Sequence, residues 1–554
     1  MRKMKNNLNG FKIKNLLPYI GLISIIVLPW FFKSGYLFFT DMVWGPNMSL
    51  SHWTSGWFYF DLIIKILSFA ISISLLEKLF IVFVLSAVVY GGYRIARAFT
   101  NNKLILFLGS AFALFNPFVY DRLMYGQTGA TLSYGFLLVV FGYLLKYYFK
   151  PLNKKPLFLA SIFAGFSFWP SPHFAFFIIL IYLVFGVLIF VKLISEKRQK
   201  QIFKVFKYFI LSVLIVLAIN FNWLYGVFFG NSNIAQTVGE TITKQDLLAF
   251  KTIGSTPFET VQNVFLMSGF WGMAQFRYES LKDIKENWGR SFYFLLPIII
   301  LGLIYNFKNG EKKRLNFALI FIFITAFILA LGIALPFTSK ITLWLFNNVP
   351  FYKGLREPQK WVAVIAAIYE IFLVCGLIEL FKKRIVVKHK QLIAFLIFFI
   401  ILLQAPLLVW GGAGQIKSTN YPSDWYEVDD LIIKDSCCKS KILFLPWHLY
   451  MGFKWVGNII ANPSPRFFKC PVIYGKNMEF GGIYDRSDDR ESVAVRKWLS
   501  SRGKTDLLKD NEINIGYIIL AKEVDWRNYL WIEKLSGIEF VRETKNLKVY
   551  KVER

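Results

Sequence analysis

Length, composition and charge restrict the kind of protein that this chain can be. It has 554 residues, of which 56% are hydrophobic and 19% aromatic, and this composition excludes an ordinary soluble globular protein. The composition is typical of a polytopic membrane protein. The formal net charge is +30, and a strongly basic chain can bind nucleic acid, so the positions of the basic residues have to be considered.

Long apolar segments recur through the first three quarters of the chain. Each carries almost no charge, and about 20 such residues cross the hydrocarbon core of a bilayer. The sequence predicts about eleven transmembrane helices, at residues 16–33, 76–93, 104–119, 129–147, 157–171, 173–193, 208–229, 291–306, 315–336, 361–381 and 391–410. The segment at residues 61–78 is short and flanked by charges, and we expect it to lie along the membrane interface.

The loops between these segments predict the orientation of the chain. Cytoplasmic loops of membrane proteins are enriched in Lys and Arg. With the amino terminus inside, the inner segments are rich in basic residues and contain only two acidic ones, Glu196 and Glu311. We therefore predict a multi-pass protein of the plasma membrane, with a cytoplasmic N-terminus and an extracytoplasmic C-terminal domain. The basic residues then determine the orientation of the chain in the membrane, and no nucleic-acid partner is expected.

The predicted outer face contains two long loops, at residues 34–75 and 230–290, and the carboxyl-terminal part of the chain. We expect residues 1–410 to form the membrane domain and residues 411–554 a small soluble α+β domain. The first apolar segment is followed by polar and aromatic residues instead of a cleavage site, so we expect it to remain as a helix.

Short patterns support the α+β domain. The segments "KILFLPWH" and "INIGYIILAKE" are typical of buried strands, and "IEFVRETKNLKVYKV" predicts a hairpin that turns at Lys545 and Asn546. The segment "SVAVRKWLSSRG" predicts a helix that ends at Gly503. Three cysteines, at positions 437, 438 and 470, lie in this domain, where a disulfide to the last of them is permitted but is not determined by the spacing.

The topology resembles that of the GT-C class of membrane glycosyltransferases. The shared features are an inner amino terminus, a first outer loop that opens on an Asp, about eleven spans and an outer C-terminal domain. Within this class, "NPFVYDRLMYGQ" and "YKGLREPQKW" resemble segments of archaeal and bacterial arabinofuranosyltransferase-like members. The Trp-Trp-Asp-Tyr-Gly motif of oligosaccharyltransferases is absent from the sequence, so an Asn side chain is not the expected acceptor.

The resemblance implies transfer of a sugar from a polyprenyl-phosphate or polyprenyl-diphosphate donor to a glycan or glycolipid acceptor on the outer side of the membrane. It also implies that the first-loop acidic residue, Asp41 in "GYLFFTDMVWGPNMS", acts as the general base. A lipid-linked donor keeps its phosphate at headgroup depth, which is where the sequence places Asp41. The alternative is that Asp41 only caps a helix or faces water.

Asp121 and Arg122 lie in the second outer loop, where GT-C enzymes often have a further acidic or metal-binding residue. We treat Asp121 as a second catalytic candidate, Arg122 as a phosphate ligand and the nearby Gln127 as a further candidate. The chain has no paired acidic motif at this point, so a divalent metal is possible but not supported, and no cofactor is expected. A structural ion pair between Asp121 and Arg122 is the alternative.

Three further residues are candidates for binding the donor phosphate. Arg356 and Lys360, in "GLREPQK", lie at headgroup depth directly before a predicted span, and a guanidinium group suits a phosphate. His173 lies in the turn "FWPSPHF" between two spans. The alternatives are that the two cations only anchor the helix to lipid headgroups and that the histidine is only packed.

Glu370 and Arg277 complete the set of candidates. A carboxylate within a membrane span, as predicted for Glu370, usually faces a cavity or a partner, although it can also be protonated and structural. Arg277 and Trp271 lie in the long outer loop and could close over an acceptor.

Two other functions fit the topology. One is a transporter or flippase for a lipid-linked saccharide, but charged residues in the middle of spans are few, whereas transporters commonly have several. The other is a non-catalytic assembly protein of the cell envelope, whose outer domain binds a partner. An intact fold and no loss of transfer after a change of Asp41 would favour the assembly protein.

Overall fold

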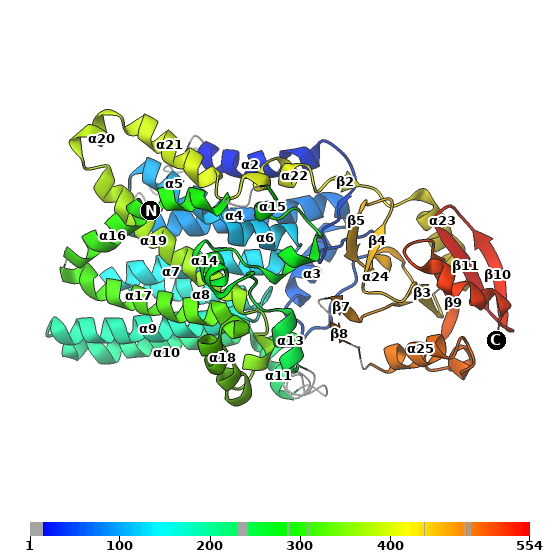
Figure 1. Ribbon diagram of the computed structural model, residues 1–554. Coiled ribbons are helices and arrows are strands. Elements are labelled where there is room, and N and C mark those ends of the chain that lie inside the picture. The colour runs from blue at the N-terminus through cyan, green and yellow to red at the C-terminus, as the bar shows by residue number, and fades with distance from the viewer. Residues whose placement is uncertain are drawn as a thin grey trace.

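The computed structural model describes residues 15–229, 242–284, 288–308, 310–436, 438–480, 483–485, 487 and 489–553. Parts of the predicted 230–290 loop and Cys437 therefore lie outside the described residues. An elongated helical bundle forms most of the molecule, and a domain that contains a mixed sheet lies at one end of it (Figure 1).

Within the described chain, seven helical segments are long and apolar enough to cross a membrane, or up to nine if each of two bent pairs is one span. The seven segments are Ile73–Phe99, Thr128–Phe149, Phe174–Ser195, Gln199–Ile219, Trp288–Lys308, Lys312–Ala334 and Pro358–Leu380. The predicted count of about eleven spans is not confirmed. One reason is that α2 (Leu17–Phe31) and α8 (Lys154–Phe168) have 15 residues each, which extend about 22 Å, whereas a bilayer core is about 30 Å thick.

Most elements of the bundle are α-helices, and short 3₁₀ helices connect several of them. The main helices are α4 (Ile73–Phe99), α5 (Lys103–Leu114), α6 (Pro117–Met124), α7 (Thr128–Phe149), α9 (Phe174–Ser195), α10 (Ile202–Ile219), α16 (Leu296–Lys308), α17 (Gly310–Leu331), α19 (Val362–Leu380) and α21 (Lys390–Leu402). The smaller helices are α3 (Phe58–Leu67), α11 (Phe221–Phe229), α13 (Lys244–Ala249), α14 (Pro257–Phe265), α15 (Leu281–Ile284), α18 (Pro336–Asn348), α20 (Arg384–Lys388) and α22 (Val409–Ala413).

The centre of the bundle is α7, which is buried along its length and packs closely on α4. Glycines permit this approach. A Cβ atom on Gly91 would lie 2.6 Å from the Cβ of Leu138, and one on Gly135 would lie 2.7 Å from the carbonyl carbon of Ala87. Small residues at helix contacts are the usual means by which membrane helices approach each other.

The break between α5 and α6 is important for the site. Asn116 caps α6 by accepting a hydrogen bond from the backbone N–H of Val119 (3.1 Å). Pro117 occupies the first helical position, where a backbone N–H would have no partner within the helix, so the absence of this group in proline costs nothing. The two helices meet at 45°. As a result, α6 and the start of α7 lie at the end of the bundle next to the C-terminal domain (Figure 1).

The predicted interfacial segment at residues 61–78 divides into two parts. Residues up to Leu67 belong to α3, a separate helix of 10 residues, and the residues from Ile73 onward are the first turns of α4. The location of α3 at a membrane interface remains a prediction.

The C-terminal part contains a five-stranded mixed sheet in the order β10–β11–β9–β3–β6. The strands β3 and β9 are the two predicted buried strands, and β10 and β11 form the predicted terminal hairpin. The strands are β3 (Lys441–Leu445), β4 (Tyr450–Phe453), β5 (Asn458–Ala461), β6 (Val472–Ile473), β7 (Met478–Phe480), β8 (Ile483–Asp485), β9 (Ile515–Ala521), β10 (Ile538–Glu543) and β11 (Leu547–Val552), with helices α23 (Ser423–Ser436), α24 (Ser464–Phe467) and α25 (Arg490–Ser500). The small sheet is confirmed, while a domain boundary at residue 410 remains a prediction.

The first outer loop is joined to the C-terminal part by backbone pairing. Strand β1 (Tyr36–Leu37) pairs antiparallel with β2 (Ser418–Thr419). The indole N–H of Trp30 donates to the carbonyl oxygen of Ile416 at 2.9 Å. These bonds hold the two chain segments together at the end of the bundle, with the first outer loop between the helices and the sheet.

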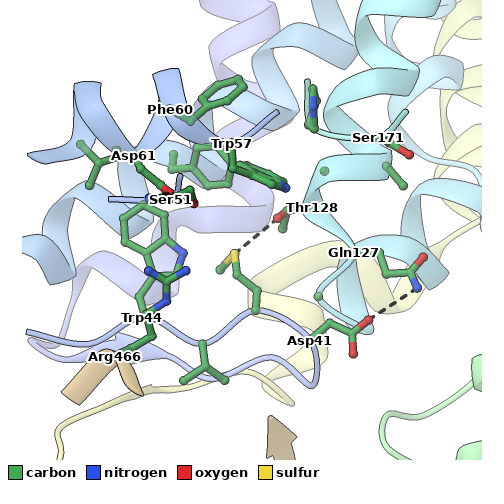
Figure 2. Close-up of a pocket in the computed structure, with 18 of the residues that line it drawn as sticks. Asp41, Trp44, Ser51, Trp57, Phe60, Asp61, Gln127, Thr128, Ser171 and Arg466 are labelled. Atoms are coloured by element: carbon green, nitrogen blue, oxygen red, sulfur yellow. Dashed lines mark hydrogen bonds between the residues drawn. The ribbon is translucent and has the colours of Figure 1, made fainter. Parts of the chain in front are cut away.

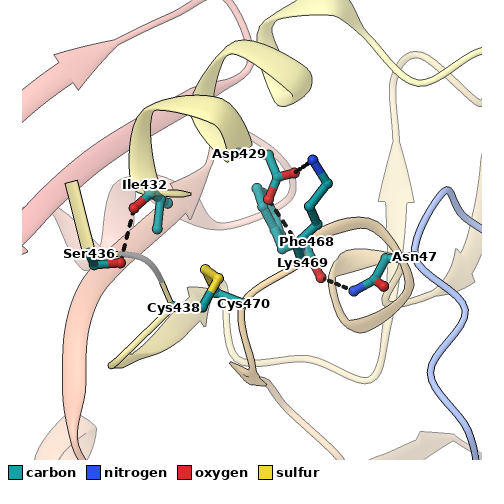
Figure 3. Close-up of a disulfide and its surroundings, with 8 residues drawn as sticks. All are labelled: Asn47, Asp429, Ile432, Ser436, Cys438, Phe468, Lys469 and Cys470. Carbon is teal, nitrogen blue, oxygen red and sulfur yellow. Dashed lines mark hydrogen bonds and ion pairs between the residues drawn. A yellow bond between two sulfur atoms is a disulfide. The ribbon is translucent and has the colours of Figure 1, made fainter. Parts of the chain in front are cut away.

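A disulfide fixes a third segment at this junction. Cys438 and Cys470 are joined, which selects one of the pairings that the spacing permitted, and Cys375 is a buried free thiol. Figure 3 shows that the chain directly before Cys470 reaches the first outer loop, where Asn47 donates from its side-chain amide to the carbonyl oxygen of Phe468 at 2.6 Å.

Candidate active site

A cavity of about 410 Å³ lies where the first outer loop, the ends of the bundle helices and the C-terminal part meet. Some of its polar side chains form two groups, while Thr128 and Ser171 lie elsewhere along the wall (Figure 2). Asp41 and Gln127 point toward each other at one end, and Asp61, Ser51 and Arg466 lie together at the other. The wall between them is largely apolar and aromatic and includes Trp44, Met48, Trp57, Phe60, Ile64 and Phe80.

Asp41 is held by bonds to two separate parts of the chain, the turn between α6 and α7 and strand β4. Its backbone N–H donates to the carbonyl oxygen of Tyr125 at 2.9 Å, and its Oδ1 accepts a hydrogen bond of 2.8 Å from the hydroxyl of Tyr450 in β4. The amide of Gln127 lies 3.5 Å from Oδ2. Because this last contact is long, Oδ2 is the carboxylate oxygen with remaining capacity to accept a proton.

The approach of the first loop to the start of α7 depends on Gly126. This residue has φ of +89°, and a Cβ atom on it would lie 2.7 Å from the backbone nitrogen of Met42 and 2.9 Å from that of Asp41. Only glycine fits both the backbone conformation and the space. Gly126 therefore helps to place Asp41 beside Gln127.

The environment of Asp41 makes it a stronger base than an ordinary aspartate. Burial raises the pKa of this carboxyl to about 6, although the hydrogen bonds from Tyr450 and Gln127 and the charge of Arg277 act in the opposite direction. A group with this pKa is mainly ionised at neutral pH and is still able to take up a proton.

Arg277 lies behind this pair. Its guanidinium carbon is 4.3 Å from the centre of the Tyr450 ring, and its Nη1 donates to the hydroxyl of Tyr125 at 3.2 Å. The side chain is buried and is not part of the cavity wall. The structure thus places Arg277 close to the predicted base, in a position to orient Tyr450.

Arg122 forms an ion pair with Glu357 and not with the neighbouring Asp121. Its Nη1 lies 2.8 Å from Oε2 of Glu357, and further hydrogen bonds connect the guanidinium to Gln127 and Gln359. The indole N–H of Trp271 donates to the same Glu357 oxygen at 3.0 Å. Trp271, which was expected to close over an acceptor, is therefore buried and bonded to this ion pair, outside the cavity wall.

A second cation completes this network at the cavity wall. The Nζ of Lys360 lies 2.9 Å from Oε1 of Glu357 and 3.0 Å from Nδ1 of His173. Since the ammonium group of Lys360 can only donate, Nδ1 of His173 accepts the hydrogen bond between them. The other ring nitrogen of His173, Nε2, donates to the carbonyl oxygen of Gly354 at 2.7 Å. Burial and the charge of Lys360 lower the pKa of His173 to about 3, so the imidazole is neutral.

The central carboxylate of this network stays ionised. Burial acts to raise the pKa of Glu357, but the charges of Lys360 and Arg122 hold this pKa well below its usual value. Two cations therefore share one anion, and the network has an excess positive charge. Lys360 and His173 are its members that reach the cavity wall, together with Gln127.

Three further predicted site residues lie outside the wall of this cavity. Asp121 is buried in α6 and accepts a hydrogen bond of 2.9 Å from the hydroxyl of Tyr278. Arg356 contacts Asp246 at 3.3 Å. Glu370 is buried in α19, and neither of its oxygens has a hydrogen-bond partner among the described residues.

The described residues contain no group of three or more His, Cys, Asp and Glu side chains that could hold a metal ion. Asp121 and Asp41, the two predicted acidic residues, have different hydrogen-bond partners, and only Asp41 reaches the cavity. The described side chains do not provide the several oxygen ligands that a divalent cation normally requires.

The sequence-based interpretation missed four residues of the site. Tyr450 lies 409 residues after Asp41, and no local pattern connects them. Glu357 stands between two residues that were predicted, in "GLREPQK", so its position was an available signal. Asp61 and Arg466 form the second polar end of the cavity, and the former belongs to the segment that was predicted to be interfacial.

Comparison with known proteins establishes the class of fold. No family model matches the sequence, and no curated protein matches it. The structure nevertheless shares its fold with solved structures of an arabinofuranosyltransferase, the kind of protein that the resemblance predicted.

The solved structures that show this are those of arabinofuranosyltransferase AftD from Mycobacteria. A mutant form of AftD superimposes with a TM-score of 0.58 at 12% identity, over 97% of this chain and 41% of that one. A second AftD structure gives a TM-score of 0.55 at 12% identity, over 97% of this chain and 40% of that one. The chain thus spans about two fifths of the length of AftD.

Proposed function

We propose that this protein is an integral membrane glycosyltransferase, which transfers a sugar from a polyprenyl-phosphate or polyprenyl-diphosphate donor to a glycan or glycolipid acceptor on the extracytoplasmic side. The observation that carries the proposal is the position of Asp41, a carboxylate with an available oxygen at one end of a cavity whose wall also includes the cationic Lys360. The GT-C fold, which the chain shares with the arabinofuranosyltransferase AftD, supports the reaction class.

In the proposed reaction, Oδ2 of Asp41 takes the proton of an acceptor hydroxyl. The acceptor oxygen then forms a bond to the anomeric carbon of the donor sugar, while the bond from that carbon to the phosphate oxygen breaks. The leaving group is the polyprenyl phosphate or diphosphate, which carries away the electron pair. Tyr450 holds Oδ1 and keeps Oδ2 directed to the acceptor, which supports general-base catalysis.

Lys360 is the residue that we propose to stabilise the leaving phosphate. It lies in the cavity wall, and it shares its negative partner Glu357 with Arg122, so part of its charge is available to an anion. Neutral His173 can accept from Lys360 or turn to a phosphate oxygen. Arg122 supports Lys360 through their shared partner Glu357. Arg356 is paired with Asp246 outside the cavity wall, and we propose that it contacts the donor before the donor enters the cavity.

The opposite end of the cavity suits the acceptor. Trp44, Trp57 and Phe60 present aromatic surface, and Asp61 and Arg466 supply polar groups that can bind hydroxyls. Binding sites for small molecules commonly combine such apolar walls with a few placed polar groups. We therefore place the acceptor between this end and Asp41.

The experiment that tests the proposal is transfer of labelled sugar from polyprenyl-phosphate donors by the purified protein and by the Asp41→Asn variant. Loss of a general base lowers the rate by about 10²–10⁴-fold. An Asp430→Asn variant is a matched control, since Asp430 is exposed in α23 and should transfer as wild type does. The thermal unfolding of each variant shows whether it is folded.

Equal transfer by wild type and Asp41→Asn would contradict the role of Asp41 and direct attention to Asp121. If the folded wild-type protein transfers no sugar from any polyprenyl-linked donor, a flippase for lipid-linked saccharides or a non-catalytic assembly protein is the better interpretation.

A further inference from the structure

A second cavity, of about 760 Å³, lies between α2, α4 and α5. It is at the end of the bundle away from the C-terminal domain. Helix α4 begins beside β1, near that domain, and its 27 residues extend about 40 Å, so Arg94 and Arg97 near its last turns reach the other end (Figure 1). The sequence predicts this end to be cytoplasmic.

The walls of this cavity are apolar and aromatic. They include Ile23, Val89 and Leu106, and the ring of Tyr19 lies edge-on to that of Tyr93 with 5.8 Å between the ring centres. Ile20 lines the cavity and is 50% exposed, and Leu17, which does not line it, is 57% exposed in the same helix α2. The apolar surface therefore continues along α2 beyond the cavity.

The charged residues that line the cavity are all basic: Arg94, Arg97 and Lys103, with no acidic side chain among the described lining residues. The guanidinium of Arg94 lies 4.1 Å from the centre of the Tyr143 ring, and its buried Nε has no hydrogen-bond partner in the described part of the chain. The partner of Lys103 is the neutral side chain of Asn15, at 3.1 Å. These cations thus have no carboxylate among the described lining residues to neutralise them.

We propose that this cavity binds an anionic phospholipid of the adjacent leaflet. The phosphate contacts Arg97, Lys103 and the inward-facing Arg94, and an acyl chain lies along the apolar wall between α2 and α5. A cationic end joined to an apolar volume matches such a lipid, whereas a free phosphate would leave the apolar volume unfilled. Basic residues close to a cytoplasmic membrane surface commonly recognise anionic lipids.

The test uses the full-length protein purified in detergent, with binding of phosphatidylglycerol and phosphatidylcholine followed by native mass spectrometry. The cavity variant is Arg97→Gln with Lys103→Gln, because both side chains are exposed and their loss should leave the fold intact. The matched control is Lys154→Gln with Lys155→Gln, two exposed lysines that do not line the cavity. A third variant, Ile20→Trp, reduces the apolar volume and keeps the charges.

We expect wild type to prefer phosphatidylglycerol, and the cavity variant to bind it about thirtyfold more weakly, since each of the two basic residues near an anionic surface contributes about fivefold. The control variant should bind as wild type does, and Ile20→Trp should also weaken binding. Melting curves show that each variant is folded.

Three results would overturn the proposal. The first is equal binding of phosphatidylglycerol by wild type and the cavity variant, and the second is equal binding of the two lipids by wild type. The third is displacement of phosphatidylglycerol by inorganic phosphate together with unchanged binding in Ile20→Trp, which would show that the cavity recognises phosphate alone.

Discussion

The hydroxyl of Tyr450 donates a hydrogen bond of 2.8 Å to Oδ1 of Asp41, so a residue of the C-terminal part completes the surroundings of a carboxylate in the first outer loop. This bond stabilises the ionised form of Asp41 and lowers its pKa. The same bond occupies Oδ1 and leaves Oδ2, which has only a long contact of 3.5 Å to Gln127, as the less engaged oxygen. The C-terminal part therefore controls both the charge and the orientation of the proposed base.

The variant Tyr450→Phe should raise the pKa of Asp41 above about 6, because it removes a hydrogen bond that favours the carboxylate. The acidic limb of the pH profile of kcat/KM should move to higher pH. Compared with wild type, the variant should therefore lose more activity at acidic pH than at high pH. The measurement is transfer activity over a pH series. A Tyr474→Phe variant, outside the cavity wall, is the control, and an acidic limb that does not move in Tyr450→Phe would show that Tyr450 acts only in packing.

Wild-type activity should itself fall as the pH decreases through about 6, the pKa to which burial raises Asp41. Below this pH the carboxyl is protonated and cannot take the proton of an acceptor hydroxyl. The measurement is kcat/KM for the acceptor at saturating donor, with the melting temperature followed at each pH. Activity that stays constant from pH 7 to below the ordinary pKa of an aspartate would contradict Asp41 as the base.

The variant Asp41→Asn should stabilise the protein at neutral pH. Because the folded state raises the pKa of Asp41 from 3.8 to about 6, it binds the proton more tightly than the unfolded state does, and stability is lost as the pH rises through this window. The gain at neutral pH is at most about 3 kcal/mol. Thermal unfolding should show this gain at pH 7 and little difference near pH 4; a variant that melts below wild type at pH 7 would refute it.

The variant Arg122→Ala should destabilise the protein strongly. Arg122 and Glu357 form a buried ion pair, and removal of one partner of such a pair typically costs about 3–5 kcal/mol. The exposed pair of Arg198 and Glu196 provides the control, since Arg198→Ala should cost about 1 kcal/mol or less. Unfolding curves of both variants measure the loss in the free energy of unfolding. Similar losses in the two variants would show that the Arg122–Glu357 pair stabilises the protein no more than an exposed ion pair does.

The variant Lys360→Met should weaken the use of the donor. Loss of a hydrogen bond to a charged group costs about 1.5–3 kcal/mol, which corresponds to about 10- to 100-fold in kcat/KM for the donor. It should also raise the pKa of His173 toward its ordinary value, because the nearby positive charge is removed. An exposed lysine of α18, Lys340, provides the control as Lys340→Met. An unchanged kcat/KM for the donor would exclude contact between Lys360 and the phosphate.

The features that the sequence predicted are those that depend on local patterns. Short apolar runs predicted the buried strands β3 and β9, a local pattern predicted the terminal hairpin, and long apolar segments predicted the helical bundle. The number of spans was less predictable because an apolar segment shows its composition but not where a helix bends, as at Asn116 between α5 and α6.

The candidate site was predictable where the residues belong to short segments that resemble a known class. Asp41, Gln127, Lys360 and His173 all line one cavity. The hydrogen bond from Tyr450 and the choice of Glu357 over Asp121 as the partner of Arg122 depend on contacts between segments far apart in the chain. No periodicity or spacing encodes such contacts, so these features required the three-dimensional structure.

The pairing of β1 with β2 has a consequence for how large molecules gain access to the cavity. Since Tyr36 and Leu37 are bonded to the residues that lead into the C-terminal part, this part cannot swing away from the membrane without breaking the strand that precedes Asp41. A hinged opening would therefore separate the residues around Asp41. Under the proposed function, we expect a polymeric acceptor to enter sideways along the membrane surface by its terminal residue, so that chain ends would be extended and their interior would not be modified.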